Sequence, residues 1–282
     1  MPGGAGAKEA RRPDIVALRP GLWLLEARAE AFDVRAAVVA GAARCVVWDT
    51  LSRPPDMEGV AELIGDLPFR VAYSHGDWDH VWGTGGLPRD WEEIVAHEAC
   101  GSRFRDDIPG ALAEKVASEP DLYGSVTLVP PTRTFRRRTT LELGGITLEM
   151  HSLPGHTPDT IVGYIPQWNI FLGGDAVEHP LPFLNSGRGI EGWVRGLERW
   201  TARLEAAGKG AAEENASGEE PGLVPPLPVV IPSHGPVGGP QLLRANARYL
   251  RELAAGREPE LPPGLTQFYR ETHAANLALA RE

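Results

Sequence analysis

The sequence predicts an α+β fold, a four-layer αββα sandwich in which two β-sheets pack face to face between outer helices. Two observations lead to this expectation. The chain has two strand-rich halves, with helical segments between and after them. Clusters of polar residues also follow apolar runs, as residues 74–80 follow 69–73. In such a sandwich the strand ends meet along one edge, so the polar clusters would lie together there.

The first half opens with apolar runs at 22–25 and 34–39, which we expect to form a hairpin. Phe32 lies at the tip of this hairpin. Two interpretations are open: Phe32 contacts a substrate, or it is an exposed loop aromatic without a role. Further strands are expected at 45–48, 69–73 and 94–97. Asp56 is expected to cap a helix, and 100–122 is interpreted as a helix interrupted at Pro109-Gly110.

The second half shows the clearest local signal, two alternating runs at 139–143 and 146–150 joined by Gly144-Gly145. Further strands are expected at 161–165, 169–172 and 229–231. Helices are expected at 191–206, 239–255 and 265–280. The segment 208–228, rich in Gly, Glu, Ala and Pro, is predicted to be a mobile surface loop.

Length and composition indicate an ordinary globular protein. With 42% hydrophobic and 23% charged residues, the 282-residue chain can form a sizeable core. We predict a disordered tail at 1–13 and one domain at 14–282, because the motif residues are spread over most of the chain. The 28 basic and 38 acidic side chains give a net charge of −10, which disfavours nucleic acid as a partner. Arg133 and the arginines at 136–138 are interpreted as a solvated strand face.

The expected cellular location is based on sequence signals that were not found. No apolar run reaches the length of a membrane span, and the N-terminus has no apolar segment like that of a secretion signal. Two cysteines, Cys45 and Cys100, are too few for a disulfide framework. We therefore expect a cytoplasmic protein without a membrane partner. A homodimer is left open.

Residues 74–80, Ser-His-Gly-Asp-Trp-Asp-His, are typical of a loop at the end of a strand. The loop carries imidazoles at His75 and His80 and carboxylates at Asp77 and Asp79. A divalent cation would relieve the repulsion between like charges, because neutral imidazole and carboxylate are its usual ligands. Taken alone, the loop is explained equally well as an acidic loop with stray histidines.

Three further segments place one His or Asp after an apolar run: 153–159 with His156, 171–175 with Asp175, and 230–235 with His234. Four such motifs in this order resemble the metallo-β-lactamase superfamily. The resemblance covers nearly the whole chain, from about Ile15 to the helix expected after His234. It implies the αββα sandwich of that superfamily and two adjoining metal sites.

The resemblance also implies the ligands of two divalent ions. One ion would be held by His75, Asp77 and His156, and the other by Asp79, His80 and His234, with Asp175 bridging both. Asp79 is implied as the catalytic residue that handles a proton. In the superfamily a water shared by two such ions becomes a nucleophile near neutral pH.

Asp77 departs from the family pattern, His-x-His-x-Asp-His, in which a second histidine usually stands at this position. A carboxylate favours harder ions than imidazole does, so iron or manganese gains on zinc. It also makes the cluster less positive, and we expect a weaker Lewis acid as a result. Zinc remains the first expectation. We favour Asp77 as a direct ligand over an outward-pointing residue replaced by water. The reason is that His75, Asp77 and Asp79 alternate, and an extended backbone would direct all three to one side.

The leading hypothesis is a metal-dependent hydrolase that uses a metal-bridging water or hydroxide on a small-molecule ester, thioester or lactone. The alternative is an iron-dependent oxidoreductase of the same fold, of the persulfide dioxygenase or diiron type. A third hypothesis, metal binding without catalysis, applies if Asp77 leaves the first site empty. Metal analysis distinguishes them, because zinc favours hydrolysis and iron favours the oxidoreductase.

Several neighbours of the motifs are given smaller roles. Thr157 and Asp159 are candidates to orient His156, and Asp49 is a candidate to orient another ligand. Glu178 is expected at the surface, with a place near the substrate as the alternative. The histidines interpreted as core or surface residues are His97, His151 and His273.

Overall fold

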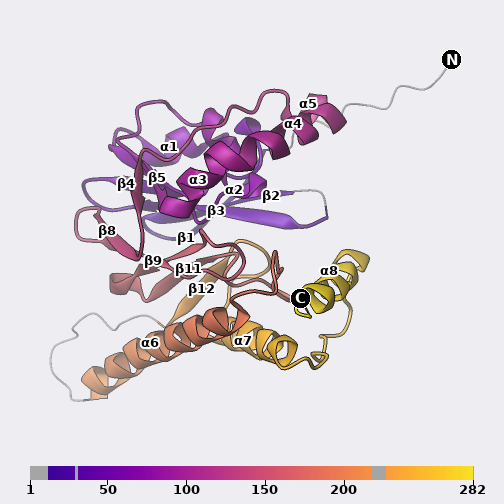
Figure 1. The fold of residues 1–282 in the computed structure, drawn as a ribbon. Coiled ribbons are helices and arrows are strands. Elements are labelled where there is room, and N and C mark those ends of the chain that lie inside the picture. The colour runs from indigo at the N-terminus through magenta and orange to yellow at the C-terminus, as the bar shows by residue number, and fades with distance from the viewer. Residues whose placement is uncertain (1–11, 29–30, 217–226, 282) are drawn as a thin grey trace.

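The computed structural model describes residues 12–28, 31–216 and 227–281. Here the chain forms two β-sheets that pack face to face, with helices on both outer sides (Figure 1). The first seven strands make one sheet in the order β1-β2-β3-β4-β5-β6-β7. The remaining five make the second sheet in the order β12-β11-β10-β9-β8. The predicted αββα sandwich is therefore confirmed.

The strands lie close to the predicted runs. The first sheet consists of β1 (Asp14–Arg19), β2 (Leu22–Arg28), β3 (Asp33–Ala40), β4 (Cys45–Trp48), β5 (Phe69–Ala72), β6 (Ile94–His97) and β7 (Arg133–Phe135). The second sheet consists of β8 (Arg138–Glu142), β9 (Thr147–Ser152), β10 (Ile161–Ile165), β11 (Ile170–Gly174) and β12 (Val229–Pro232). The pairs β4–β5 and β11–β12 are parallel, so their carboxyl ends lie side by side at one edge of each sheet.

The alternation of side chains along the strands explains the layers. Val39 in β3 and Ile161 in β10 belong to the core between the sheets. Their neighbours Val38 and Val162 face the opposite way, toward the outer helices. Each fully buried side chain of this size contributes about 1.5–3 kcal/mol to folding. A shift by one residue would turn every such side chain to the wrong face, so the pattern sets the register.

The helices cover both outer faces. Those that accompany the first sheet are α1 (Val60–Ile64), α2 (Trp78–Val81), α3 (Glu98–Asp106), α4 (Ile108–Ser118) and α5 (Pro120–Tyr123). Those of the second half are α6 (Ile190–Ala216), α7 (Gln241–Ala254) and α8 (Gln267–Leu279). In Figure 1, α6 and α7 run beneath the second sheet. None of the helices described is long and apolar enough to cross a membrane.

Two local expectations are wrong. The helix expected at 100–122 is interrupted at Asp107 instead of Pro109-Gly110, because Pro109 lies in the first turn of α4, where a missing N–H removes no bond. Asp56 makes no cap, since its carboxylate is paired with Arg53 at 2.7 Å.

The mobile loop predicted at 208–228 is also wrong in its first part. Helix α6 continues past the predicted end at residue 206 and stops at Ala216. The sequence after residue 206 is rich in Ala, Glu and Lys, which favour a helix, and the two glycines there do not outweigh them. Residues 217–226, and residues 1–11 of the predicted tail, lie outside the described part of the chain. The division into one domain stays a prediction.

Candidate metal centre

The polar residues that follow four strands meet at one edge of the sandwich. His75 follows β5, His156 follows β9, Asp175 follows β11 and His234 follows β12. The remaining predicted ligands, Asp77, Asp79 and His80, lie at the start of α2 or just before it. The structure thus brings all seven predicted ligands together.

The carboxylate of Asp175 lies among all four histidines of the cluster. Its Oδ2 is 3.7 Å from Nε2 of His75, 3.7 Å from Nε2 of His156 and 3.3 Å from Nε2 of His234. Its Oδ1 is 3.3 Å from Nε2 of His80. A carboxylate that is shared by two ions would need this central position.

The other donors form two groups on either side of Asp175. One group consists of His75, Asp77 and His156, and the other of Asp79, His80 and His234, with the donor atoms of each group within 4.8 Å of one another. In the first group Oδ2 of Asp77 is 3.4 Å and 3.1 Å from the two imidazole Nε2 atoms. In the second group the carboxylate of Asp79 is 3.7 Å and 3.6 Å from them. These groups match the two ligand sets expected from the sequence.

Backbone carbonyls orient the two histidines of the second sheet. His156 donates its Nδ1–H to the carbonyl oxygen of Phe183 at 2.9 Å. His234 donates its Nδ1–H to the carbonyl oxygen of Asp33 at 2.9 Å. In the neutral imidazole this leaves the lone pair on Nε2, which points into the cluster and is free to bind a metal.

Asp49 orients the two histidines of the first sheet, as expected for one of them. Its Oδ2 accepts the Nδ1–H of His80 at 3.0 Å and the hydroxyl of Ser74 at 2.7 Å. The Ser74 oxygen in turn lies 3.0 Å from Nδ1 of His75. Asp49 adopts a left-handed backbone conformation, with φ of 59°. A residue other than glycine is strained there by roughly 1–3 kcal/mol, and such strain is concentrated at functional sites.

Buried atoms without a partner mark the middle of the cluster. Among the described residues, Nε2 of His75, Nε2 of His80 and Oδ1 of Asp175 are buried and make no hydrogen bond. Each unsatisfied buried group costs about 1–3 kcal/mol. A divalent cation would satisfy all three, and a mixed imidazole and carboxylate set suits zinc as well as iron or manganese. The residues present therefore fit divalent metal ions.

The carboxylates hold protons on the imidazoles when no cation is bound. Burial alone would lower the pKa of His156, but the hydrogen bond that its ring donates to Asp77 and the charge of Asp175 raise that pKa to about 10. Burial is likewise outweighed at His234, where Asp175 raises the pKa to about 9. Only a neutral imidazole binds a metal, so metal binding has to displace these protons.

Asp77 points into the cluster and is paired with an arginine that the sequence analysis did not single out. Nη1 of Arg103, on α3, lies 2.7 Å from Oδ1 of Asp77 and 3.3 Å from Oδ1 of Asp159. The other oxygen of Asp77 faces His75 and His156. Arg103 therefore places a positive charge beside the extra carboxylate, which offsets part of the negative charge that Asp77 adds to the cluster. The other reason for expecting iron or manganese, the preference of a carboxylate for harder ions, does not depend on this charge.

The backbone around Asp77 also differs from the expected alternation. Asp77 itself is extended, with φ −73° and ψ 153°. Helix α2 begins at the next residue, so Asp79 and His80 project from a helical turn and not from an extended strand. The turn lets two adjacent residues join the same ligand group.

Two of the proposed neighbours of His156 have other partners. Asp159 accepts the backbone N–H of Gly76 at 2.7 Å and so fixes the ligand loop. The Thr157 hydroxyl bonds to that of Thr160 at 2.7 Å. Neither makes a hydrogen bond to the His156 ring, and that expectation is wrong. The backbone carbonyl of Phe183 accepts the hydrogen bond from the His156 ring instead. No sequence pattern near His156 indicates this partner.

Glu178 is buried beside the cluster, so the expected surface position is wrong. Its Oε1 accepts the backbone N–H of Phe183 at 2.9 Å and lies 3.9 Å from Nδ1 of His156. Burial, with the charge of Asp175, raises the pKa of Glu178 to about 7. The apolar pair directly before it, Ala176-Val177, was the available signal for burial.

The cluster opens into a cavity of about 250 Å³ with aromatic walls. Its aromatic lining residues are Phe32, Trp78, Phe183, Phe268 and Tyr269. The Phe32 ring lies edge-on to His234, with 4.8 Å between the ring centroids. Phe32 therefore lies in the wall of the cavity. Of the two interpretations left open for Phe32, this position supports contact with a substrate.

The sequence profile of the metallo-beta-lactamase superfamily matches residues 30–209, more than half of the chain. A linear primary-alkylsulfatase from Pseudomonas sp. (strain ATCC 19151) is 26% identical over 134 residues. A hydroxyacylglutathione hydrolase from Anaeromyxobacter dehalogenans (strain 2CP-C) is 26% identical over 104 residues. The matches cover 47% and 36% of this chain, but only 22% and 31% of these relatives.

Solved structures agree in fold. A metallo-beta-lactamase from Pontibacter korlensis superposes with a TM-score of 0.60 at 21% identity, covering 85% of this chain and 99% of that one. The metallo-beta-lactamase FIM-1 from Pseudomonas aeruginosa, in a mono-zinc form, gives a TM-score of 0.60 at 18% identity, covering 86% and 96%. Sandwich, motif order and sequence profile agree, and the chain belongs to the metallo-β-lactamase superfamily.

Proposed function

We propose that the protein is a metal-dependent hydrolase that acts on a small-molecule ester, thioester or lactone with two divalent ions, zinc first among them. The observation that carries this proposal is the set of seven donor side chains around Asp175, in which buried donor atoms are left without a partner. Membership of the superfamily supports it. One relative is named a hydrolase, and FIM-1 is named in a mono-zinc form. Both names also support the proposal.

When bound, two adjacent ions supply a water acidified towards neutral pH and an electrophilic contact for a carbonyl oxygen. The chain contributes the remaining functions. Asp79 lines the cavity, and its Oδ2 lies 3.6 Å from Nε2 of His234. In this proposal the Asp79 carboxylate takes the proton of the attacking water. His75 and His80 lie behind this surface, held through Asp49, and keep the donors in place.

The cavity favours a compact substrate with an apolar part. Its volume of about 250 Å³ is below the usual range for drug-sized ligands. Five aromatic rings in its lining would hold an alkyl or aryl group and exclude water from the reacting bond. Lys115, whose Nζ lies 4.7 Å from the centre of the Trp78 ring, adds a positive charge to the wall. A substrate with an acidic group on its apolar part would benefit from that charge.

The test is metal analysis together with an assay of a panel of aryl esters, thioesters and lactones. We expect about two divalent ions per chain, hydrolysis of at least one ester class, and loss of both after treatment with a chelator. His97→Ala is the control, because His97 caps α3 away from the cluster and should retain the metal. Iron with consumption of oxygen and no ester hydrolysis would replace the proposal with the oxidoreductase alternative.

A further inference from the structure

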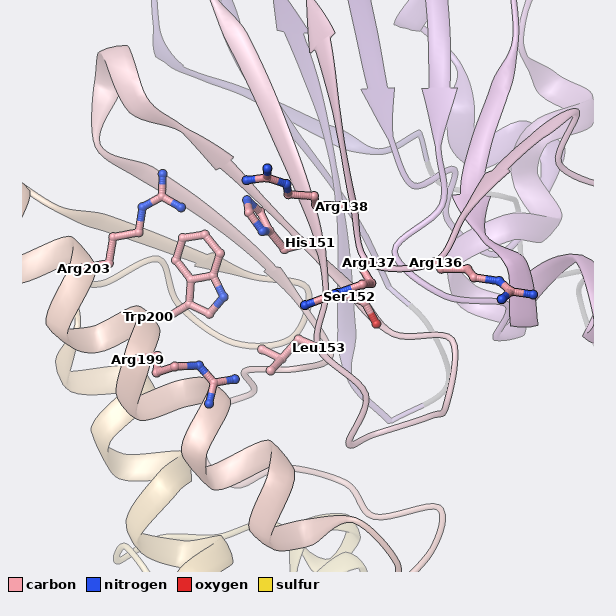
Figure 2. A pocket seen from close by; sticks show the side chains of 9 residues that line it. All are labelled: Arg136, Arg137, Arg138, His151, Ser152, Leu153, Arg199, Trp200 and Arg203. Atoms are coloured by element: carbon pink, nitrogen blue, oxygen red, sulfur yellow. The ribbon is translucent and has the colours of Figure 1, made fainter.

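A second concave region, which we call the cationic hollow, lies between the β8–β9 hairpin and α6 (Figure 2). Its volume is about 780 Å³. It is lined by Arg136, Arg137, Arg138, His151, Ser152, Leu153, Arg199, Trp200 and Arg203. None of these residues lines the cavity of the metal centre, so the two regions are separate.

The fold assembles the hollow from two distant segments. Arg138 and His151 are directly opposite each other in the β8–β9 pair, so their side chains share one face of the hairpin. The intervening alternate positions belong to the core between the sheets, so this face is the one turned toward α6. On α6, Arg199 and Arg203 are four residues apart and lie on the same side of the helix. Figure 2 shows them together with Trp200 across from the hairpin.

The floor of the hollow is held in place by specific contacts. Glu149 accepts hydrogen bonds from Arg203 at 2.9 Å and from His151 at 3.0 Å. The Arg203 guanidinium lies over Tyr164, 4.4 Å from its ring centre, and 4.9 Å from that of Trp200. The hollow is therefore a built surface, with one arginine fixed at its base.

The charge of the hollow is not balanced within the protein. Arg203 is paired with Glu149, and Arg136 points away from the others and is paired with Glu98 at 2.6 Å. In the described part of the chain, Arg137, Arg138 and Arg199 have no carboxylate within ion-pair distance. The protein as a whole has a net charge of −10. A hollow with three guanidiniums that lack a carboxylate partner therefore differs in sign from the overall charge of the chain. Like charges that line one hollow repel one another, and an anion in the hollow would relieve that repulsion.

We propose that the cationic hollow binds a small molecule that carries at least two phosphate-type groups. Guanidinium groups pair with phosphate oxygens through two parallel hydrogen bonds, and three arginines from two segments can serve two such groups. A single-stranded nucleic acid is disfavoured, because its bases would need an aromatic face on which to stack. Trp200, the aromatic residue of the lining, is only 8% exposed and lies against Arg203 and His151.

The proposal is tested by calorimetric titration of the metal-loaded protein with propane-1,3-diol bisphosphate at low ionic strength. We expect saturable binding, at least about tenfold tighter than that of inorganic phosphate. The double variant Arg138→Gln, Arg199→Gln should weaken binding by at least about tenfold. Arg195→Gln is the matched control: Arg195 is on the same helix, is paired with Glu191 and does not line the hollow, so its loss should change the affinity by less than about twofold.

Several outcomes would overturn the proposal. One is no saturable binding by the wild-type protein at about 10 mM bisphosphate, since even a weak site with a Kd of about 1 mM would be about nine-tenths filled at that concentration. Another is equal weakening by Arg195→Gln, which would show a general effect of net charge. Undiminished binding in the double variant would place the bisphosphate elsewhere, at the metal centre above all. Tighter binding of a short single-stranded RNA than of the bisphosphate, lost in the double variant, would replace the ligand class. Binding is read without turnover, so failure of the proposed hydrolase activity would leave this test intact.

Discussion

The metal centre and the cationic hollow hold their charged side chains in different ways. At the metal centre every histidine has one nitrogen tied to a carbonyl, a carboxylate or a hydroxyl, and the ring is buried. In the hollow, Arg137, Arg138 and Arg199 are exposed and have no ion-pair partner in the described residues. The centre is thus organised before a ligand arrives, whereas the hollow must order long side chains when it binds, at about 0.5–1.5 kcal/mol each. We therefore expect tight binding at the centre and weaker, salt-sensitive binding in the hollow.

The two regions also gather different kinds of charged side chain, although one strand serves both. His151, in β9, lines the hollow, and His156, just after β9, lies in the metal centre. The centre gathers the carboxylates Asp77, Asp79 and Asp175 beside imidazoles, a set of donors that suits divalent cations. Variants that affect one region and spare the other show whether this separation is real.

The largest effect is expected from Asp175→Ala. Because Asp175 contacts both ligand groups, its loss should remove both ions and lower kcat/KM at least about 1000-fold, or roughly 4 kcal/mol of transition-state stabilisation. Bisphosphate binding in the hollow should not change. Metal counting by mass spectrometry and the titration described above measure the two effects. Full metal occupancy in this variant would show that Asp175 does not bridge.

Asp77→Ala should affect one ligand group and leave the other. We expect about one ion per chain, retained by Asp79, His80 and His234, since a metal site that loses one of its few protein ligands binds much more weakly. Asp77→His is the companion variant, and it should retain two ions and favour zinc over manganese. Two ions bound to Asp77→Ala with unchanged affinity would exclude Asp77 as a ligand.

Arg103→Met tests whether the arginine positions Asp77. We expect metal affinity at the first ligand group to fall about 10–100-fold, as for other groups that orient a ligand. Unfolding free energy should also fall by roughly 1–3 kcal/mol, because Asp159 is fully buried and loses its charged partner. Arg105→Met, in the same helix but exposed, is the control. A loss of stability with unchanged metal affinity would assign Arg103 a purely structural role.

The smallest effect is expected from Glu178→Gln in the metal-free protein. The pKa of Glu178 rises from its ordinary value of 4.5 to about 7 in the folded state, so the folded protein holds this proton more tightly than the unfolded chain. Its contribution to stability is present below pH 4.5 and is lost as the pH rises to about 7. The variant should therefore become more stable than the wild type across that interval, by roughly 1–3 kcal/mol. Denaturant unfolding at several pH values measures this, with the exposed Glu191→Gln as control. Parallel curves for wild type and Glu178→Gln would contradict it.

The sequence by itself determined the layers and the order of the motifs. Strand alternation and a polar residue after an apolar run are local features, so His75, His156, Asp175 and His234 could be placed at strand ends and expected to meet. Their role as metal ligands stays a prediction. Local composition was a poorer guide where signals conflict, as in α6, where the glycines led to the prediction of a loop but Ala and Glu extend the helix to Ala216.

Only the tertiary structure decided which charges meet. Arg103 reaches Asp77 because α3 packs beside the ligand loop, and no spacing along the chain indicates that pair. Arg138 and Arg199 share a hollow because α6 lies against the β8–β9 hairpin, and without the helix the strand arginines had been interpreted as an ordinary solvated face. Side-chain periodicity depends on neighbours along the chain, whereas electrostatic partners depend on distance through space, and that distance exists only once the elements have packed.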